Sequence, residues 1–380
     1  MFDHIIACIR SLFPGRDFIP LHEPRFVGRE KEYVNAAIDS TFVSSVGEYV
    51  TRFEKMICDY TGANHAVATV NGTAALHAAL LVAGVGENDE VITQPLTFVA
   101  TANAIAYCRA HPVFVDVDRE TLGLSPGALE SFLQHYGEKT SQGWRNKTTG
   151  RRIAACLPMH TFGHPCRIER IAEICNTYNI ALIEDAAESL GSTYNGMHTG
   201  TFGRLGIYSL NGNKTITCGG GGMIVTNDPS LARHARHLTT TAKQPHPYLY
   251  NHDELGYNYR MPNLNAALAC AQLENLEKFI AAKRALAGEY LSFFSREAET
   301  FFCTEPPDSR SNYWLNAVLF KDHTTRDAFL EASNQAKVMT RPAWNLLNTL
   351  PMYERCLAGS LDNAQWLADR IVNLPSSARI

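Results

Sequence analysis

The feature of this 380-residue sequence that most constrains its fold is the alternation of short apolar runs with helical patterns over roughly its first 230 residues. Helical segments such as 73–84 and 167–179 carry apolar residues at intervals of three and four, as amphipathic helices do. The intervening runs read as strands: HAVATV (65–70), EVITQP (90–95), HPVFVDV (111–117), IAACLPM (153–159), IALIED (180–185), LGIYSL (205–210) and GMIVTN (222–227). This alternation predicts an α/β fold with one large seven-stranded sheet covered by helices.

The pattern changes after residue 228, which predicts a smaller C-terminal α/β domain. Helical patterns and a single clear strand, WLNAVLF, follow there: helices at 231–237, 263–289 and 326–334, and the strand at 314–320. We place the boundary in the Pro- and His-bearing stretch 243–252, which gives a large domain over 1–245 and a small one over 246–380. The N-terminal segment 1–19 fits a short amphipathic helix.

One segment interrupts the alternation. Residues 137–152 (GEKTSQGWRNKTTGRR) combine one Glu with five Lys or Arg and several glycines, which predicts an exposed loop or hairpin. Two interpretations of this segment remain open: it is a solvent-exposed basic loop, or it contacts a substrate phosphate.

Composition excludes several classes of protein. The 34 basic and 38 acidic side chains give a net charge of −4, which offers no electrostatic case for binding nucleic acid or an anionic membrane. No apolar run approaches the roughly 18 residues of a membrane-spanning helix, so we expect a soluble protein. The ten cysteines are scattered without a C-x-x-C pair, which favours reduced thiols in the cytoplasm. The histidines form no H-E-x-x-H motif, and we expect no metal site.

The first candidate site is the turn from Val70 through Asn71 and Gly72 to Thr73. A strand that turns through a glycine directly into a helix aims free backbone N–H groups and the positive helix end at one point, which suits a phosphate. Thr73 adds a hydroxyl, either as the helix N-cap or as a ligand. The same residues also begin helices that bind nothing.

The second candidate is the strand end Ile183–Glu188 (IEDAAE). In an open parallel sheet the carboxyl ends of the strands form the ligand-binding edge. Asp185 and its acidic neighbours there can bind a metal, pair with a cationic ring nitrogen, or cap the next helix.

The third candidate is Lys214, in SLNGNKT (209–215), shortly before four glycines at 219–222. Little side-chain bulk surrounds this amine, so a ligand can approach it closely. The segment is not a Walker A loop, because Asn213 rather than glycine precedes the lysine. A polar and aromatic cluster, GYNYRM (256–261), is either a further contact or a turn that joins the domains.

Together, the three candidates supply what pyridoxal 5'-phosphate (PLP) requires. A lysine can form a Schiff base with its aldehyde, an aspartate at a strand end can pair with its ring nitrogen, and a Gly-Thr helix start can hold its phosphate. The conjunction of Lys214, Asp185 and Gly72-Thr73 is far more specific than any one of them.

Ordered motifs then give the chain a family resemblance. It resembles the DegT/StrS-type sugar aminotransferases, from about residue 20 to residue 375, in FVSSVGEYVTRFE, NGTAALHAAL, QPLTFVATANAI, PVFVDVD, HTFGHP, IEDAAESLGS, SLNGNK, GGGGMIVTND and GYNYRMPNLNAAL. The resemblance implies the PLP-dependent transferase fold of aspartate aminotransferase (type I). It also implies a homodimer whose active site is shared between subunits.

The resemblance assigns roles to single residues. Lys214 would be the catalytic lysine, and a set of cofactor contacts would surround it: Gly72, Thr73, Phe98, Asp185, Glu188, Ser209 and Asn258, the last from the second subunit. Glu188 occupies a position that often holds Gln or His. The implied substrate contacts are Ser44, Ser45, Asn71, His160, Asn211, Arg341 and Trp344. Related sugar dehydratases replace the lysine with His, so a lysine at 214 implies transamination.

Within the family, the NGNK element with LHEPRFVG (21–28) most resembles the legionaminic acid and bacillosamine branch. This predicts amination of UDP-4-keto-6-deoxy-N-acetylglucosamine at C4, with L-glutamate as amino donor. The alternatives are a GDP- or dTDP-linked 4-keto-6-deoxyhexose, as in perosamine-type synthesis, and a non-catalytic PLP-binding relative.

Overall fold

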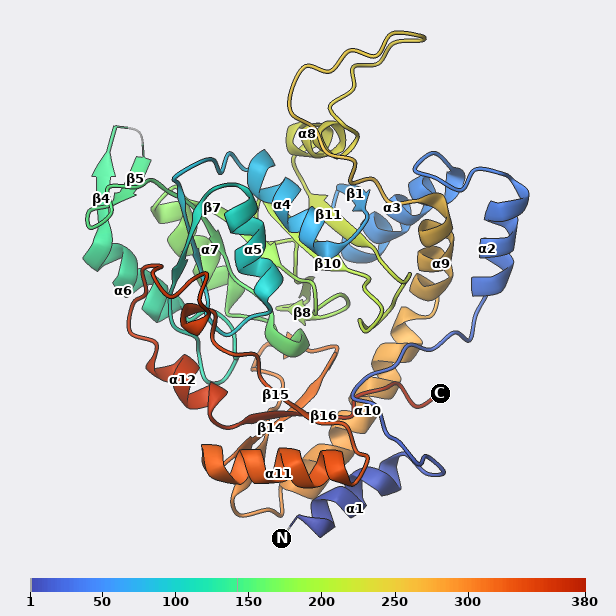
Figure 1. Cartoon of the computed structure of the whole chain (residues 1–380), viewed down its shortest axis with the longest axis vertical. Coiled ribbons are helices and arrows are strands. Elements are labelled where there is room, and N and C mark those ends of the chain that lie inside the picture. Colours follow the sequence, from blue (N-terminus) through green and yellow to red (C-terminus); the bar gives the residue numbers. More distant parts are fainter. Residues whose placement is uncertain (1, 142) are drawn as a thin grey trace.

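The computed structural model describes residues 2–141 and 143–380 (Figure 1). Its central element is a seven-stranded sheet in the order β1-β11-β10-β7-β6-β2-β3. The strands are β1 (His65–Thr69), β2 (Glu90–Thr93), β3 (His111–Phe114), β6 (Ile153–Leu157), β7 (Ala181–Asp185), β10 (Leu205–Ser209) and β11 (Gly222–Thr226). These are the seven runs predicted from the sequence, and the α/β prediction is confirmed.

The strand directions bring three chain segments to one edge of this sheet. Strands β10, β7, β6, β2 and β3 are parallel, whereas β11 is antiparallel to both of its neighbours. The start of β11 therefore meets the ends of β1 and β10, with Gly222 opposite Thr69 and Ser209. On the other side of β10, Ile207 pairs with Asp185 at the end of β7. The phosphate-type turn, the acidic strand end and the segment before Lys214 thus converge.

Helices cover both faces of the sheet, because alternate residues of each strand point to opposite sides. Val67 and Ile183 pack under helices α4 (Gly72–Val82), α5 (Val99–Tyr107) and α8 (Pro229–Thr239). Ala68 and Leu182 face the opposite layer, which comprises α3 (Glu48–Thr61), α6 (Pro126–Tyr136), α7 (Ile168–Thr177) and α9 (Asn263–Leu273). Helix α2 (Glu30–Asp39) packs against α9.

A second sheet lies below the first in Figure 1, in the order β12-β14-β16-β15. Its strands are β12 (Thr300–Phe302), β14 (Asn316–Phe320), β15 (Arg341–Pro342) and β16 (Ile371–Leu374). Helices α10 (Leu276–Phe294), α11 (His323–Gln335) and α1 (Asp3–Leu12) pack on it, and α12 (Asp362–Ala368) lies nearby. The sequence predicted only the strand at 314–320, and it predicted α9 and α10 as one helix. Because α1 packs here and α9 on the large sheet, the division at 245/246 stays a prediction.

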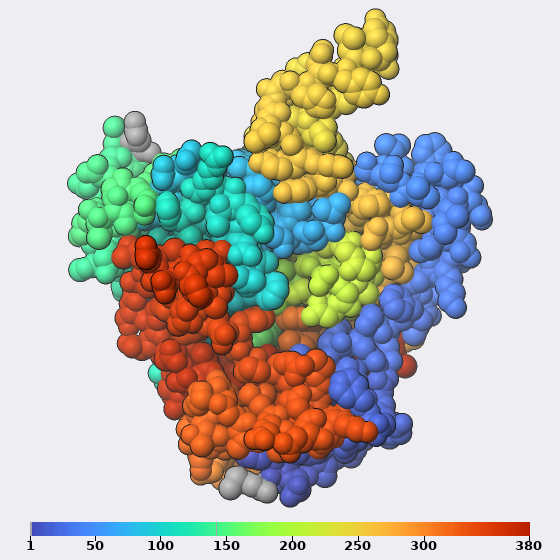
Figure 2. Space-filling view, viewed as in Figure 1, coloured from blue at the N-terminus to red at the C-terminus, as the bar shows by residue number. Residues whose placement is uncertain are grey.

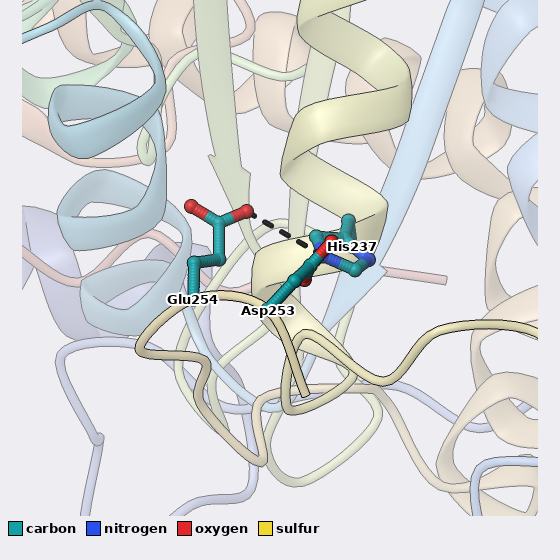
Figure 3. Close-up of side chains that lie close together, drawn as sticks. All are labelled: His237, Asp253 and Glu254. Atoms are coloured by element: carbon teal, nitrogen blue, oxygen red, sulfur yellow. Dashed lines mark hydrogen bonds and ion pairs between the residues drawn. The ribbon is translucent and has the colours of Figure 1, made fainter. Parts of the chain in front are cut away.

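The predicted domain joint at 243–252 is the stem and tip of a projecting arm, drawn in gold at the top of Figures 1 and 2. Lys243 pairs with His252 across the arm. At its base, Nε2 of His237 on α8 lies 2.6 Å from a carboxylate oxygen of Asp253 and 3.6 Å from one of Glu254 (Figure 3). These side-chain contacts and the backbone bond from Tyr257 N–H to the Leu238 carbonyl hold the arm against α8.

The basic segment at 137–152 was predicted to be a loop or a hairpin. It forms a hairpin of β4 (Gly137–Thr140) and β5 (Gly143–Asn146). Gln142 lies outside the described residues. Arg145 pairs with Glu138 within the hairpin, and Arg152 pairs with Asp89. Among the described helices, none combines the length and apolar character needed to cross a membrane.

Candidate active site

A cavity of about 380 Å³ opens at the edge of the large sheet where β7 and β10 end and α4 begins. Most of the residues predicted from the sequence line it: Asn71, Gly72, Thr73, Phe98, Asp185, Glu188, Ser209, Asn211, Lys214 and Trp344. No residue described in the 137–152 hairpin is among the lining residues. The structure therefore gives no support to a phosphate contact from that hairpin.

One end of the cavity is formed by the start of α4. Asn71 is the N-cap, because its side-chain oxygen accepts a hydrogen bond of 2.8 Å from the Ala74 N–H. The alternative that Thr73 caps this helix is therefore wrong, and its hydroxyl is left for the cavity. The N–H groups of Gly72 and Thr73 lie in the first helical turn, where an α-helix offers them no carbonyl partner. They meet the positive end of the helix dipole, which suits an anion.

Glycine at 72 is required by the close approach of α4 to β10. A Cβ atom at this position would lie 2.9 Å from Cβ and 3.1 Å from Oγ of Ser209. The absence of a side chain thus lets the Ser209 hydroxyl reach the helix start. The predicted phosphate ligands Gly72, Thr73 and Ser209 form one contiguous group.

Asp185 also lines the cavity and is buried at the end of β7. One carboxylate oxygen accepts a hydrogen bond of 2.8 Å from the Thr101 hydroxyl, and the other accepts one of 3.2 Å from the Ala187 N–H. Burial raises the pKa of Asp185, because the charge is poorly solvated; the two hydrogen bonds and the charges of Lys214 and His160 oppose this only in part. A cationic ligand atom would supply the missing counter-charge.

Lys214 lies in a tight turn after β10, with its N–H bonded to the Asn211 carbonyl at 3.0 Å. The Trp314 indole donates a hydrogen bond of 2.7 Å to the Asn213 carbonyl, and the Lys214 Nζ lies 3.9 Å above the Trp314 ring. This cation–π contact and the turn fix the amine in the cavity.

Glu188 faces Lys214 from the segment after β7. Its Oε1 lies 3.2 Å from Nζ of Lys214, and its Oε2 accepts a hydrogen bond of 2.9 Å from the Phe162 N–H. Burial raises the pKa of this carboxyl to about 7, against the attraction of the lysine. The expected contact of Glu188 with a cofactor is untested, but the residue lies where a ligand beside Lys214 would touch it.

Aromatic side chains form the open side of the cavity. Phe98 is 50% exposed, and its ring centroid lies 6.4 Å from that of Trp344. Trp344 in turn packs against Phe162, with ring centroids 5.1 Å apart. An exposed phenylalanine at the mouth of a polar cavity can stack on a planar ligand.

Several predicted residues lie outside this cavity. His160 does not line it: the side chain is fully buried, with Nε2 3.0 Å from Glu184 and Nδ1 accepting the Cys166 N–H, and its contact with substrate stays a prediction. Arg341 is exposed and donates to Asn334 instead.

Ser44, Ser45 and Asn258 are exposed on the surface of the subunit, away from its own cavity. The expectation that Asn258 serves a second subunit is compatible with this position and remains a prediction.

The sequence reasoning missed three residues that organise the site. Thr101 bonds Asp185, Trp314 supports Lys214, and Phe162 holds Glu188. Thr101 falls within the motif QPLTFVATANAI, so it could have been found there. Trp314 opens the one strand predicted in the C-terminal part, but nothing local links it to a lysine 100 residues earlier.

The donor set fits the phosphate, the aldehyde and the ring nitrogen of PLP. The helix start with Thr73 and Ser209 offers N–H and hydroxyl donors to a phosphate, and Lys214 offers an amine for an aldehyde. Asp185 is a buried carboxylate with neutral partners, which suits a protonated ring nitrogen. The cavity thus has one anion-binding end, one cation-binding side and one nucleophile.

Comparison with known proteins gives matches over almost the whole chain. The model of the DegT/DnrJ/EryC1/StrS aminotransferase family matches residues 25–380. The GDP-perosamine synthase of Escherichia coli O157:H7 is 39% identical over 360 residues, which is 94% of this chain and 93% of that protein. The GDP-perosamine synthase of Caulobacter vibrioides is 36% identical over 365 residues, 95% of this chain and 93% of that protein. Among solved structures, the aminotransferase TlmJ from Streptoalloteichus hindustanus superposes with a TM-score of 0.86 at 27% identity, covering 94% of this chain and 93% of that one.

Proposed function

Because the chain belongs to the DegT/DnrJ/EryC1/StrS aminotransferase family, whose members are PLP-dependent sugar aminotransferases, we propose that it aminates C4 of a GDP-linked 4-keto-6-deoxyhexose. The amino donor in this proposal is L-glutamate, and the product is a perosamine-type GDP-4-amino-4,6-dideoxy sugar. The observation that carries the choice of sugar is the 39% identity to a GDP-perosamine synthase over 94% of the chain. Family membership also speaks against the non-catalytic alternative.

This proposal replaces the UDP-linked sugar expected from the sequence. That expectation rested on short motifs shared with one branch of the family. Three full-length relatives that are 39%, 36% and 36% identical are GDP-perosamine synthases. Similarity over more than nine-tenths of the chain outweighs a few short motifs, so the perosamine-type alternative is better supported.

The cavity residues fit the chemistry that this reaction needs. When bound, PLP supplies an aldehyde for condensation with amines and a cationic ring that withdraws electrons from the reacting carbon. We assign Lys214 the covalent attachment and, when its amine is free, the uptake and return of the substrate proton at Nζ. Asp185 keeps the ring nitrogen protonated. The remaining contacts would hold the phosphate (Gly72, Thr73, Ser209), stack on the ring (Phe98), and contact the sugar nucleotide (Asn71, Asn211, Trp344).

We also propose that two copies of the chain form the active enzyme. Apolar side chains are exposed on the N-terminal segments and on the projecting arm: Phe26, Val27, Phe42, Val43, Val46, Tyr248, Tyr250 and Leu255. Exposed apolar groups on this scale mark association surfaces. Asn258 at the base of the arm, together with Ser44 and Ser45, would then reach the cavity of the partner. The ten cysteines are all free thiols, which fits a reducing compartment, the cytoplasm.

A coupled assay tests the substrate. The purified enzyme receives glutamate with GDP-, UDP- or dTDP-linked 4-keto-6-deoxy sugars, and the release of 2-oxoglutarate is measured. We expect the highest kcat/KM with the GDP-linked sugar. A preference for the UDP-linked N-acetylated sugar would overturn the proposal in favour of the other branch. The Lys214→Arg variant should show no turnover with any of the three.

A further inference from the structure

Glu188 lines the cavity beside Asp185 and Lys214. A carboxylate there adds a second negative charge beside Asp185. Only 2% of Glu188 is exposed, so water does not stabilise that charge. A buried carboxylate is retained where a cation or hydrogen-bond donors compensate it.

The structure divides the two carboxylate oxygens of Glu188 between two tasks. Oε2 accepts the Phe162 N–H at 2.9 Å. Phe162 has a φ of 58°, a left-handed conformation that is uncommon for an aromatic residue and that aims this N–H at Glu188. Because Oε2 is occupied, Oε1 is fixed toward Nζ of Lys214, at 3.2 Å.

The backbone of Glu188 is also held in place. The Asn312 amide donates hydrogen bonds of 2.9 Å to the Glu188 carbonyl and 2.9 Å to the Leu190 carbonyl. Its side-chain oxygen accepts the N–H of Trp314, whose ring lies under Nζ of Lys214. One asparagine thus connects both supports of the lysine, the carboxylate on one side and the indole on the other.

We propose that Glu188 is a positioning residue for Lys214: its Oε1 holds Nζ over the Trp314 ring and stabilises the ammonium form, which makes the free lysine a stronger base. The inference rests on the role proposed above for Lys214. In the step concerned, one proton leaves the substrate carbon and arrives at Nζ, while the electron pair of the broken C–H bond stays with the substrate. The new positive charge forms 3.2 Å from a buried carboxylate.

Several other titratable groups lie around the pair. Asp185 lies near enough to raise the pKa of Glu188, and His160 and His22 also face this group of residues. His22 is held neutral, because burial and the neighbouring lysines lower its pKa well below the usual value. His160 is occupied by Glu184. Glu188 is therefore the carboxylate in direct contact with Nζ, and Asp185 acts from further away.

Because the Glu188 carboxyl titrates, its stabilisation of the Lys214 ammonium form depends on pH. Burial raises the pKa of this carboxyl to about 7, so its charge is present above that pH and lost below it. The stabilisation of the ammonium form is then available on the alkaline side of neutrality.

The test uses the cofactor-free protein, so that it does not depend on turnover. Trace acetic anhydride, which acetylates only uncharged amines, is applied across neutral and alkaline pH, and acetylation of Lys214 is quantified by peptide mass spectrometry. Exposed Lys278 serves as the internal reference. The variants are Glu188→Gln, which keeps an oxygen for the Phe162 N–H but removes the charge, and Glu188→Asp, which keeps the charge but shortens the reach. Glu87→Gln, an exposed position, controls for loss of a carboxylate elsewhere.

We expect the midpoint of Lys214 acetylation to move to lower pH in Glu188→Gln, by about one pH unit or more, because an opposite charge in contact has been removed. Glu188→Asp should move it less, and Glu87→Gln should not move it. An unchanged midpoint in folded Glu188→Gln would overturn the inference. If that variant does not fold, a wild-type midpoint in Glu188→Asp, with its carboxylate withdrawn from Nζ, overturns it instead.

A separate measurement distinguishes this inference from the proposed function. Loss of the absorbance band of the Schiff base between PLP and Lys214, in Lys214→Arg loaded with PLP, upholds the role of the lysine. If the midpoint of Lys214 acetylation then stays unchanged in Glu188→Gln, only the role proposed for Glu188 is refuted. A band that persists in Lys214→Arg would remove the premise, and the two failures are thereby distinguished.

Discussion

Lys283 offers a stability prediction whose size can be worked from the structure. The side chain is fully buried in α10, with Nζ donating to the carbonyls of Trp314 at 3.1 Å and Ser376 at 2.5 Å. Both partners are neutral, and burial lowers the pKa of this lysine from 10.5 to about 7. At neutral pH the fold thus holds an amine that the unfolded chain would protonate.

The pH dependence follows from this difference. Between about pH 7 and pH 10.5 the unfolded chain binds one more proton than the folded protein, so the free energy of unfolding rises with pH. At about 1.4 kcal/mol for each pKa unit, the full effect is roughly 5 kcal/mol. Between pH 7 and pH 9 it amounts to about 2 kcal/mol. For a chain of 380 residues this corresponds to about 3 °C in melting temperature.

Lys283→Met removes the titrating amine while keeping a chain of similar length. Its stability at pH 7 should change little, because relief from the cost of deprotonating the buried amine offsets two carbonyls left without a donor, each costing about 1–3 kcal/mol. The diagnostic quantity is the slope: wild type should gain about 3 °C relative to the variant between pH 7 and pH 9 by differential scanning fluorimetry. Lys278→Met, an exposed position on the same helix, should keep the wild-type slope. Parallel pH profiles for wild type and Lys283→Met would refute the reasoning.

Two further predictions concern the active site. Gly72→Ala should weaken PLP binding at least about tenfold, because its Cβ would lie 2.9 Å from Cβ of Ser209; a titration followed by absorbance measures this. Gly288→Ala, where a Cβ meets no atom within 4 Å, should bind like wild type, and equal affinities in both variants would contradict the steric argument. If Asn258 serves the partner's site, co-expressed Lys214→Arg and Asn258→Ala subunits should recover about a quarter of wild-type activity. Random pairing makes about half of the dimers mixed, and each mixed dimer has one of its two sites intact. No recovery above the separate variants would place Asn258 in its own subunit's site or outside the site.

The large sheet could be predicted from the sequence because its strands are buried on both faces. Such strands form nearly continuous apolar runs, and turn residues mark their ends. All seven runs became strands of one sheet. The small sheet was mostly missed because β12 and β15 have only three and two residues. Elements that short carry no periodicity, and their pairing with β14 and β16 decides their conformation.

The same distinction separates the site residues that were found from those that were not. Asp185, Ser209 and Gly72 occupy strand ends or a helix start, so topology alone brings them to one edge. His160 also follows a predicted strand, yet its side chain turns inward to Glu184. Its direction depends on a partner on the neighbouring strand β7, which local sequence does not encode. The contact of Trp314 with Lys214 was missed for the same reason, because it joins the C-terminal part to a distant segment of the chain.

The charges of the titratable side chains in the cavity can be matched with those of the cofactor. Of the lining residues described, Lys214, Asp185 and Glu188 carry the titratable side chains. With all three ionised, Glu188 neutralises the lysine through direct contact, and Asp185 remains as one uncompensated buried negative charge. A protonated ring nitrogen supplies that one positive charge, whereas the phosphate is met by neutral N–H and hydroxyl donors and the dipole of α4. Because Glu188 contacts Lys214 directly, Asp185 is left free to pair with the ring nitrogen.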